Sequence, residues 1–361
     1  MGSNRRRHRP ATRGLYPELE RAHQLVDSET ESRPSLEWGH QQNWRSLQRL
    51  GFRLIFPPFT SEPIETSNGV SWFNPRENYA SPFGKQWEMW SGTQLDSQTN
   101  LPLSRQRLRR VLGPLWESLG DLSVLEVGCG AGRFTEVLLS RGAMVTAVDI
   151  SSAVEVCAAS FGSSKRFRAV GASVTSLPFS HGQFDVVVCL GVIQHTPEPR
   201  RTIESLWEQV RPGGFLVVDQ YRHSLSSWLR TTWAFRFFLK RLAPEAGVKI
   251  TNMLVRTLLP MHRLVRGKRF LELLLNRLSP ITSHYSTLPL SEEQQIEWAQ
   301  LNTHDNLTDR YKFHTTRRRM ERILTGLGCS DFYSRELPYT VELIGRKPDE
   351  LDHANVLGTY T

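Results

Sequence analysis

The sequence predicts an α/β protein with a mostly parallel sheet and a helical insertion late in the chain. Three observations lead to this fold class. An apolar run at 124–127 is followed by a glycine-rich turn, an amphipathic helix and a second apolar run at 144–148. The alternation of strands and helices continues to residue 219, and a helix with two short strand-like runs follows residue 313. Parallel strands that are buried on both faces have continuous apolar runs of this kind.

Seven strands with helices on both faces of the sheet account for these segments. We expect parallel strands at 124–127, 144–148, 166–170, 184–190 and 215–219, and an antiparallel pair at 329–336 and 339–345. The expected helices are 133–140, 151–159, 200–210 and 315–327.

The glycine-rich turn is the first candidate for a ligand-binding element. Gly128, Gly130 and Gly132 stand at alternate positions, where a Cβ atom would block close approach of the backbone to a ligand. Asp149 ends the next strand, about 20 residues after the glycines. An acid at this place in dinucleotide-binding folds holds ribose hydroxyls, so the segment predicts a nucleoside-containing cofactor.

Two motifs in this segment resemble those of a known family. E-V-G-C-G-A-G-R-F at 126–134 and V-T-A-V-D-I at 145–150 are similar to the first two motifs of class I S-adenosylmethionine-dependent methyltransferases, which have a Rossmann-like fold. The L-P-F triplet at 177–179 and R-P-G-G-F-L-V-V-D at 211–219 extend the resemblance. It implies an enzyme that binds S-adenosylmethionine through Glu126, Gly128, Cys129, Gly130, Gly132, Asp149, Ile150, Ser173, Val174 and Leu190.

One position departs from the family pattern. The family usually has an aspartate where Ser173 stands, and that acid binds the adenine amino group. A serine offers only a weaker, neutral hydrogen bond. Either the affinity for the adenine falls, or another group such as the backbone amide of Val174 compensates.

The best candidate for a catalytic base is His195. It lies in the loop that follows the fourth strand, and ligands bind beyond the carboxyl ends of parallel strands. An imidazole titrates in the useful pH range, although a structural histidine in a turn is an equal alternative. Other candidates, which we expect mainly to pack or bind, are Tyr221, His223, His284, Tyr285 and His304. The cysteines Cys129, Cys157, Cys189 and Cys329 have no C-x-x-C spacing, so no metal site is predicted.

The chain is expected to contain six regions. They are a flexible basic arm (1–50), an extension with a helix over the cofactor site (51–116), the cofactor-binding core (117–221), a helical cap over the substrate region (222–312), the last helix and β-hairpin of the core (313–348) and a tail (349–361). In the extension, Trp87 and Trp90 either close over the ligands or hold the segment against the sheet. The cap should break at Pro244, Pro260 and Pro280.

Two of these regions resemble a narrower group. Segments 83–96 and 284–311 are similar to bacterial methyltransferases of surface-glycan and natural-product pathways, without the cysteine-rich zinc ribbon of many relatives. The resemblance implies a small-molecule or glycan-type acceptor that is methylated at oxygen. Polar groups near Asn302, His304 and Asp305 would then line the acceptor pocket. The rival functions are an RNA methyltransferase and a non-catalytic protein that binds the cofactor or associates with a membrane.

The positive charge of the chain favours anionic partners but does not identify one. The net charge is +9, and residues 222–277 contain twelve basic residues but only two acids. Such a cap either packs on the core with a solvated arginine face, or contacts an anionic membrane or a lipid-linked acceptor, while nucleic acid is less favoured. We find no secretory signal and no run long enough to cross a membrane, and we expect a cytoplasmic protein that is peripheral to a membrane in the second case. The sequence leaves the oligomeric state open.

Overall fold

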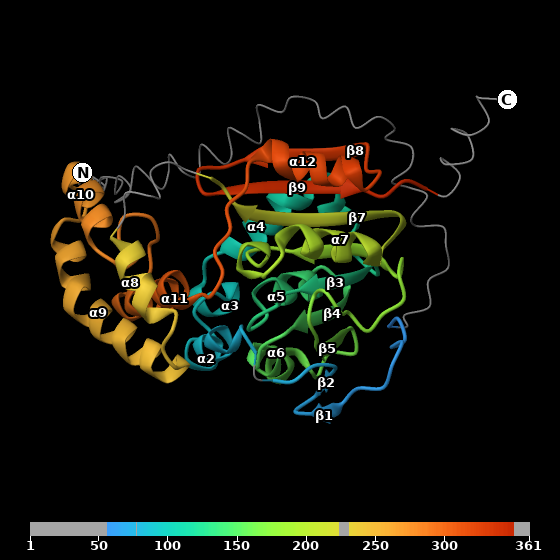
Figure 1. The fold of residues 1–361 in the computed structure, drawn as a ribbon, viewed down its shortest axis with the longest axis horizontal. Coiled ribbons are helices and arrows are strands. Elements are labelled where there is room, and N and C mark those ends of the chain that lie inside the picture. Colours follow the sequence, from blue (N-terminus) through green and yellow to red (C-terminus); the bar gives the residue numbers. More distant parts are fainter. Residues whose placement is uncertain (1–55, 77, 224–230, 350–361) are drawn as a thin grey trace, which may run out of the picture. The chain divides into compact units, whose positions relative to one another are not determined.

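The computed structural model describes residues 56–76, 78–223 and 231–349 (Figure 1). The chain divides into two units, 1–53 and 54–361, and all the described residues belong to the second unit. The expected N-terminal arm and all but the first residue of the expected tail lie outside the described residues.

A nine-stranded sheet in the order β1-β2-β5-β4-β3-β6-β7-β9-β8 forms the centre of the fold. The parallel strands are β3 (Ser123–Val127), β4 (Met144–Asp149), β5 (Phe167–Gly171), β6 (Phe184–Cys189) and β7 (Val210–Tyr221). At one edge, β9 (Thr340–Arg346) is antiparallel to β7, and β8 (Asp331–Glu336) is antiparallel to β9. All seven expected strands are therefore confirmed.

The observed sheet has nine strands rather than the expected seven. The two additional strands are β1 and β2. The hairpin of β1 (Glu65–Ser67) and β2 (Val70–Trp72) joins the sheet through β2, which runs parallel to β5. Its turn is Asn68-Gly69, and both residues have positive φ, as a type I′ turn requires. The three-residue strands are too short to show a period, although the Asn-Gly pair was a signal for this hairpin.

Strand β7 begins five residues before the expected start at 215. Phe184 pairs with Val210, and after a shift in register Val186 pairs with Phe215. The Pro212-Gly213-Gly214 turn therefore lies inside the strand as a bulge, which the left-handed φ of +73° at Gly213 accommodates.

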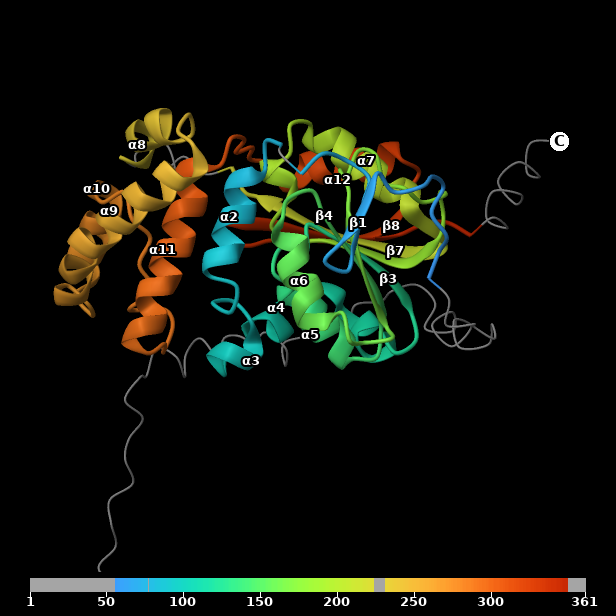
Figure 2. The same cartoon turned by 90° about the horizontal axis from the view of Figure 1, so that it is seen from below.

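Helices cover both faces of the sheet. Figure 2 shows α7 (Pro199–Gln209) and α12 (Arg317–Gly326) on one side of the strands, and α4 (Leu103–Leu112) and α5 (Arg133–Ser140) on the other. Between β4 and β5, α6 (Ala153–Phe161) completes the alternation. An apolar cluster joins the sheet to α7 and α12 and includes Val187, Leu216, Ile203, Leu206, Met320 and Leu324.

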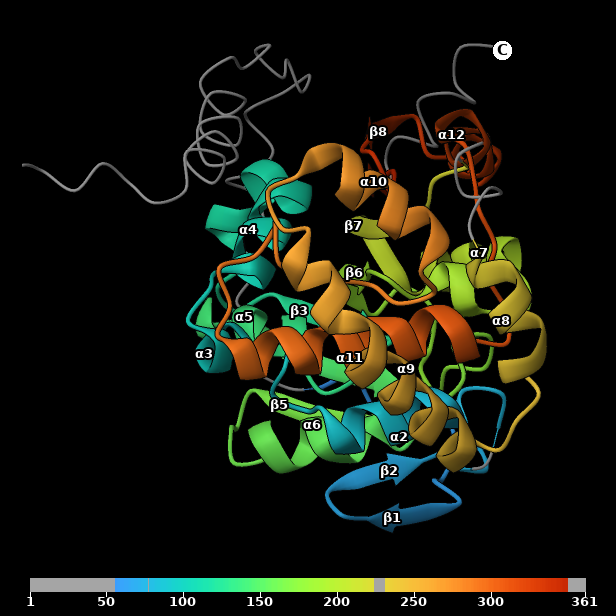
Figure 3. The same ribbon diagram turned by 90° about the vertical axis from the view of Figure 1, so that its left-hand side faces the viewer.

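The late insertion is helical, as expected, and forms the cap seen in Figure 3. It contains α8 (Thr232–Leu239), α9 (Pro244–Leu264), α10 (Arg269–Leu278) and α11 (Glu292–Thr308). A capping box of Ser291 and Gln294 begins α11. Within the described residues, no helix has the length and apolar composition needed to cross a membrane.

The expected helix break at Pro260 is wrong, because this proline lies inside α9. A proline there removes one backbone hydrogen bond from the helix. The neighbouring Val255 and Leu259 are buried in a cluster with Ile281, and this packing holds the helix together across the proline. The breaks at Pro244 and Pro280 are confirmed, since α9 begins at Pro244 and α10 ends at Leu278.

The extension before the core places α2 (Ser81–Met89) and the short α3 (Asp96–Thr99) beside the cap. Helix α2 contacts α6 of the core as well as α9 and α11 of the cap. Trp90 follows α2 and is buried against Val248 and Leu301, so it holds the extension to the cap rather than to the sheet. After α4, the chain continues as a 3-10 helix, η2 (Gly113–Ser118), into the core.

Removing the Trp72 side chain tests whether the hairpin is part of the sheet. Trp72 is fully buried, and a Cβ at its partner Gly171 would overlap the indole ring. We expect Trp72→Ala to lower the free energy of unfolding by about 3–5 kcal/mol, measured by urea denaturation. Ile64→Ala, at a side chain that is 66% exposed, should change it by less than about 0.5 kcal/mol. Equal losses in the two variants would contradict this placement.

Candidate functional site

A cavity of about 530 Å³ opens at the carboxyl ends of β3, β4 and β6. Its volume lies within the range of small-molecule sites, roughly 300–1,000 Å³. The core strands form its floor, and α2 and α11 supply residues to its walls. Strand order reverses between β3 and β6, and this switch point is where open α/β sheets bind ligands.

The glycine-rich turn forms one wall of this cavity. Gly128 and Gly130 have left-handed φ angles of +77° and +53°. A Cβ at Gly128 would overlap Val192 in the loop after β6, and one at Gly130 would lie 3.0 Å from the Trp87 indole nitrogen. Glycine is therefore required at both positions for conformation and for space.

Asp149 lies next to the glycine-rich turn and has a defined set of partners. Its carboxylate accepts hydrogen bonds from the backbone N–H of Gly130 (3.0 Å) and Ser151 (2.9 Å), and from the Ser151 hydroxyl (2.7 Å). Burial raises the pKa of Asp149, and these hydrogen bonds act in the opposite direction. The carboxylate lines the cavity in a fixed orientation.

The structure brings most of the expected cofactor residues together, but not all of them. Those that line the cavity are Gly128, Cys129, Gly130, Asp149, Ile150, Val174 and Leu190. Glu126 is buried away from it, accepts a hydrogen bond from the Thr135 hydroxyl (2.6 Å), and has a pKa that burial raises to about 8. Gly132 is also outside the lining, where a Cβ would overlap Phe161. Glu126 and Gly132 thus flank the glycine-rich turn without lining the cavity.

Ser173 does not line the cavity either. Its hydroxyl lies 3.0 Å from the Thr175 hydroxyl and accepts from the Thr175 backbone N–H at 3.4 Å. The neighbouring Val174 is buried and does line the cavity. In this conformation the serine hydroxyl is engaged within its own loop.

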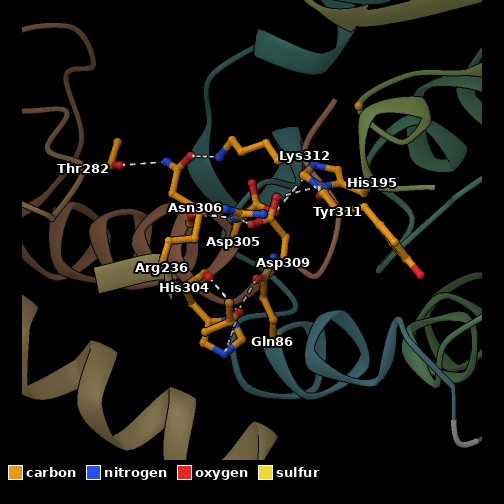
Figure 4. A network of polar contacts seen from close by, with 12 residues as sticks. Gln86, His195, Arg236, Thr282, His304, Asp305, Asn306, Asp309, Tyr311 and Lys312 are labelled. Atoms are coloured by element: carbon orange, nitrogen blue, oxygen red, sulfur yellow. Dashed lines mark hydrogen bonds and ion pairs between the residues drawn. The ribbon is translucent and has the colours of Figure 1, made fainter. Parts of the chain in front are cut away.

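His195 also lines the cavity, at the end of the short 3-10 helix η3 (Ile193–His195). Its Nδ1 is 3.0 Å from the Asp309 carboxylate and 3.3 Å from the Tyr311 carbonyl oxygen. Its Nε2 is 3.9 Å from the carboxylate of Asp305, which also lines the cavity. Figure 4 shows this network, which joins the core to residues of α11 and the segment after it.

Burial controls the charge of His195. It lowers the pKa of His195 to about 4, with Lys312 acting in the same direction and Asp305 against it. Asp309 is fully buried and forms an ion pair with Arg236, so its charge is already balanced. The imidazole is therefore neutral at neutral pH.

The sequence analysis missed three arginines that line the cavity, Arg107, Arg110 and Arg133. Arg107 forms an ion pair with the buried Asp219, and Arg133 donates to the Gln94 side chain at 2.9 Å. Burial lowers the pKa of Arg133 to about 9. Arginines on a predicted amphipathic helix are expected to point into solvent, so the sequence pattern did not indicate that these three line a cavity.

The cap and the extension supply the rest of the walls. Trp87 lines the cavity, unlike Trp90, and α11 contributes Asn302 and Asp305, where polar acceptor contacts were expected. His304, by contrast, is absent from the lining and is buried beside Gln86, 3.1 Å from its side-chain oxygen.

Of the alternative candidates for a base, Tyr221 alone lines the cavity among the described residues. Burial raises its pKa, which makes its hydroxyl a poor base. His284 instead accepts a hydrogen bond from Asn302 (3.0 Å), and Tyr285 donates one to Glu292 (2.6 Å). His223 packs against another histidine ring outside the cavity.

Comparison with known proteins agrees with this geometry. Residues 125–218 match a family model described as a methyltransferase domain. The chain is 27% identical over 172 residues to a ubiquinone biosynthesis O-methyltransferase of Pseudomonas entomophila, covering 46% of this chain and 73% of that protein. A protein of the same name from Aromatoleum aromaticum is 29% identical over 171 residues, with the same coverage. The crystal structure of magnesium protoporphyrin IX methyltransferase from Synechocystis is 15% identical, with a TM-score of 0.41, and covers 74% of this chain and 96% of that one.

The strand order, the glycine-rich turn with Asp149 and the family match lead to one class. Residues 125–218 match a methyltransferase domain, and the sheet around them has the Rossmann-like fold of class I S-adenosylmethionine-dependent methyltransferases. The protein is an enzyme that uses S-adenosylmethionine as its methyl donor.

Buried histidines predict a loss of stability in acid. Burial lowers the pKa of His195, His284 and His304 to about 4, so below about pH 6.5 the unfolded chain binds protons there that the folded chain does not. The free energy of unfolding should fall between pH 6.5 and 4, by up to about 1.4 kcal/mol per pH unit for each histidine. Glu126, with its raised pKa, offsets part of this loss. Urea denaturation at several pH values measures the slope.

The variant His304→Gln isolates one of these contributions. It should remove about a third of the histidine-dependent slope, because three groups contribute similar shifts. An unchanged slope would show that His304 is not buried in its neutral form.

Proposed function

We propose that this enzyme methylates an oxygen of a small-molecule or glycan-type acceptor, with His195 as the base. One observation carries the proposal: a single cavity is lined by the glycine-rich turn and Asp149 and also by His195 and Asp305. The names of the O-methyltransferase relatives support transfer to oxygen of a small molecule. A lipid-linked glycan is the larger acceptor that the same chemistry allows.

The cavity fits S-adenosylmethionine, which supplies an activated methyl group when bound. A Cβ on Gly128 or Gly130 would meet Val192 or Trp87, so the turn is shaped for a close backbone approach. Asp149 would accept hydrogen bonds from the ribose hydroxyls, and its own contacts hold it in place.

The remaining cofactor contacts follow from the lining residues. Ile150, Val174 and Leu190 would flank the adenine, with the backbone of Val174 in place of the missing acid at Ser173. Arg133, which keeps its charge at neutral pH, would attract the methionine carboxylate. Cys129 would contribute its backbone in the turn.

Proton removal falls to His195. The Tyr311 carbonyl oxygen accepts the hydrogen bond from Nδ1–H, which would leave Nε2 free of a proton to accept one from an acceptor hydroxyl. Asp305 and Asn302 offer hydrogen bonds to further hydroxyls of the acceptor. Positioning of this kind matters because the donor is already activated, so alignment supplies much of the rate.

We also propose a cytoplasmic location for the reaction. All four cysteines, Cys129, Cys157, Cys189 and Cys329, are buried and unpaired. Proteins of reducing compartments keep their cysteines in this form.

Calorimetric titration with S-adenosylmethionine and S-adenosylhomocysteine tests the cofactor contacts. We expect Asp149→Ala to weaken binding about 100-fold or more, because two charge-assisted hydrogen bonds to the ribose are lost. Ser173→Ala should change the affinity less than about threefold, because the serine hydroxyl is engaged with Thr175. A large loss in Ser173→Ala would mean that its hydroxyl reaches the adenine.

Formation of S-adenosylhomocysteine with a panel of phenols and hydroxylated sugars tests the base. We expect His195→Gln to lower kcat by about 10²–10⁴ with little change in cofactor affinity. Asp309→Asn should lower kcat less, since it only disturbs the orientation of the imidazole. His181→Gln, at an exposed histidine outside the cavity, is the matched control and should behave as the wild type.

A rate for His195→Gln within a few-fold of the wild type would remove His195 as the base. Transfer to amines alone would contradict the oxygen acceptor.

A further inference from the structure

Helix α10 presents an apolar stripe to its surroundings. None of its ten residues is buried, although six of them are large and apolar. Phe270, Leu273, Leu274 and Leu278 are 77%, 63%, 46% and 61% exposed. Their spacing of i, i+3, i+4 and i+8 places them on one face of the helix. We call these four residues the α10 stripe.

The preceding helix shows that the cap can bury its apolar side chains. In α9, Val248, Val255 and Leu259 are 5%, 0% and 4% exposed. The apolar face of α9 is thus packed inside the cap, as an ordinary amphipathic helix requires, whereas the face of α10 is not. An exposed stripe of this size on a folded protein marks an interaction surface.

Exposed aromatic side chains continue beyond α10. Its last turn is joined to the start of α8, where the Thr231 hydroxyl donates to the Leu278 carbonyl oxygen at 2.9 Å. On α8, Phe237 and Phe238 are 56% and 69% exposed. Leu264, at the end of α9, is 77% exposed. Further exposed apolar side chains are therefore present on the other helices of the cap.

Basic side chains accompany the stripe. Residues 261–278 contain five basic residues and one acid, Glu272. The basic residues, all exposed, are Arg263, Arg266, Lys268, Arg269 and Arg277. The carboxylate of Glu272 accepts hydrogen bonds from the Gly267 backbone N–H (2.6 Å) and from the Ser286 hydroxyl, so it is engaged within the cap.

We propose that the α10 stripe inserts into the surface of an anionic lipid membrane, with the basic side chains contacting the headgroups. A helix with an apolar face and a basic flank is suited to lie in the plane of such an interface. Charge repulsion also disfavours dimerisation of this chain through the stripe. A two-fold contact there would bring ten basic side chains and two acids together. An anionic surface instead complements the excess of positive charge.

Vesicle flotation tests this surface. The full chain is mixed with vesicles of phosphatidylcholine alone, or of equal parts phosphatidylcholine and phosphatidylglycerol. We expect flotation with the anionic vesicles only, and weaker flotation as salt screens the charges. The triple variant Phe270→Gln, Leu273→Gln and Leu274→Gln keeps good helix formers in α10 and should bind at least about tenfold less.

Two further variants separate the apolar and electrostatic parts. Ile64→Gln with Met89→Gln changes side chains that are 66% and 49% exposed outside the cap, and should float as the wild type does. Lys268→Gln with Arg277→Gln should weaken flotation at low salt and make it less salt-dependent. Titration of each variant with S-adenosylmethionine shows that it is folded, so this test is independent of the proposed acceptor chemistry.

Three results would overturn the proposal. They are the absence of flotation at low salt, equal flotation of the triple variant and the wild type, and equal binding to both kinds of vesicle. Self-association in sedimentation that the triple variant abolishes, without flotation, would assign the stripe to a second copy of the chain.

Discussion

The contact between the Asp149 carboxylate and the Gly130 backbone N–H is the constraint on which the site depends. It joins the end of β4 to the turn that follows β3, at the carboxyl edge of the sheet. The turn must then follow a left-handed path at Gly128 and Gly130, which brings it against Val192 and Trp87. A carboxylate acceptor makes this hydrogen bond stronger than a neutral one, so the turn is held in shape before any ligand arrives.

The cavity is completed by parts of the chain that are distant in sequence. Helix α2 lies between the core and the cap, and its Gln86 reaches His304 in α11. Trp90 packs into the cap, whereas Trp87 lines the cavity. One aromatic residue therefore stabilises the extension, and its neighbour forms part of the cavity wall. The extension thus supplies part of the cavity wall and also holds the cap in place.

Burial decides the charge of the candidate base, because it is the largest cause of the lowered pKa of His195. Arg236 of the cap forms an ion pair with the buried Asp309 next to the imidazole. The positive charge of Arg236 lowers the pKa of His195 further. A residue of the cap thus contributes to the neutral state of a core histidine.

The sequence by itself determined the core. Apolar runs marked β3, β4 and β6, because strands that are buried on both faces consist mostly of apolar residues. The alternate glycines and Asp149 marked the cofactor side, because backbone conformation and a single acid are local properties.

Tertiary structure alone decided that Glu126, Gly132 and Ser173 lie outside the cavity, and that Arg107, Arg133 and Asp305 lie in its walls. It also decided which apolar faces of the cap are buried, because α9 packs against α11 and α2 whereas no residue of α10 is buried. Residues far apart in the chain meet only through packing, which no local pattern encodes.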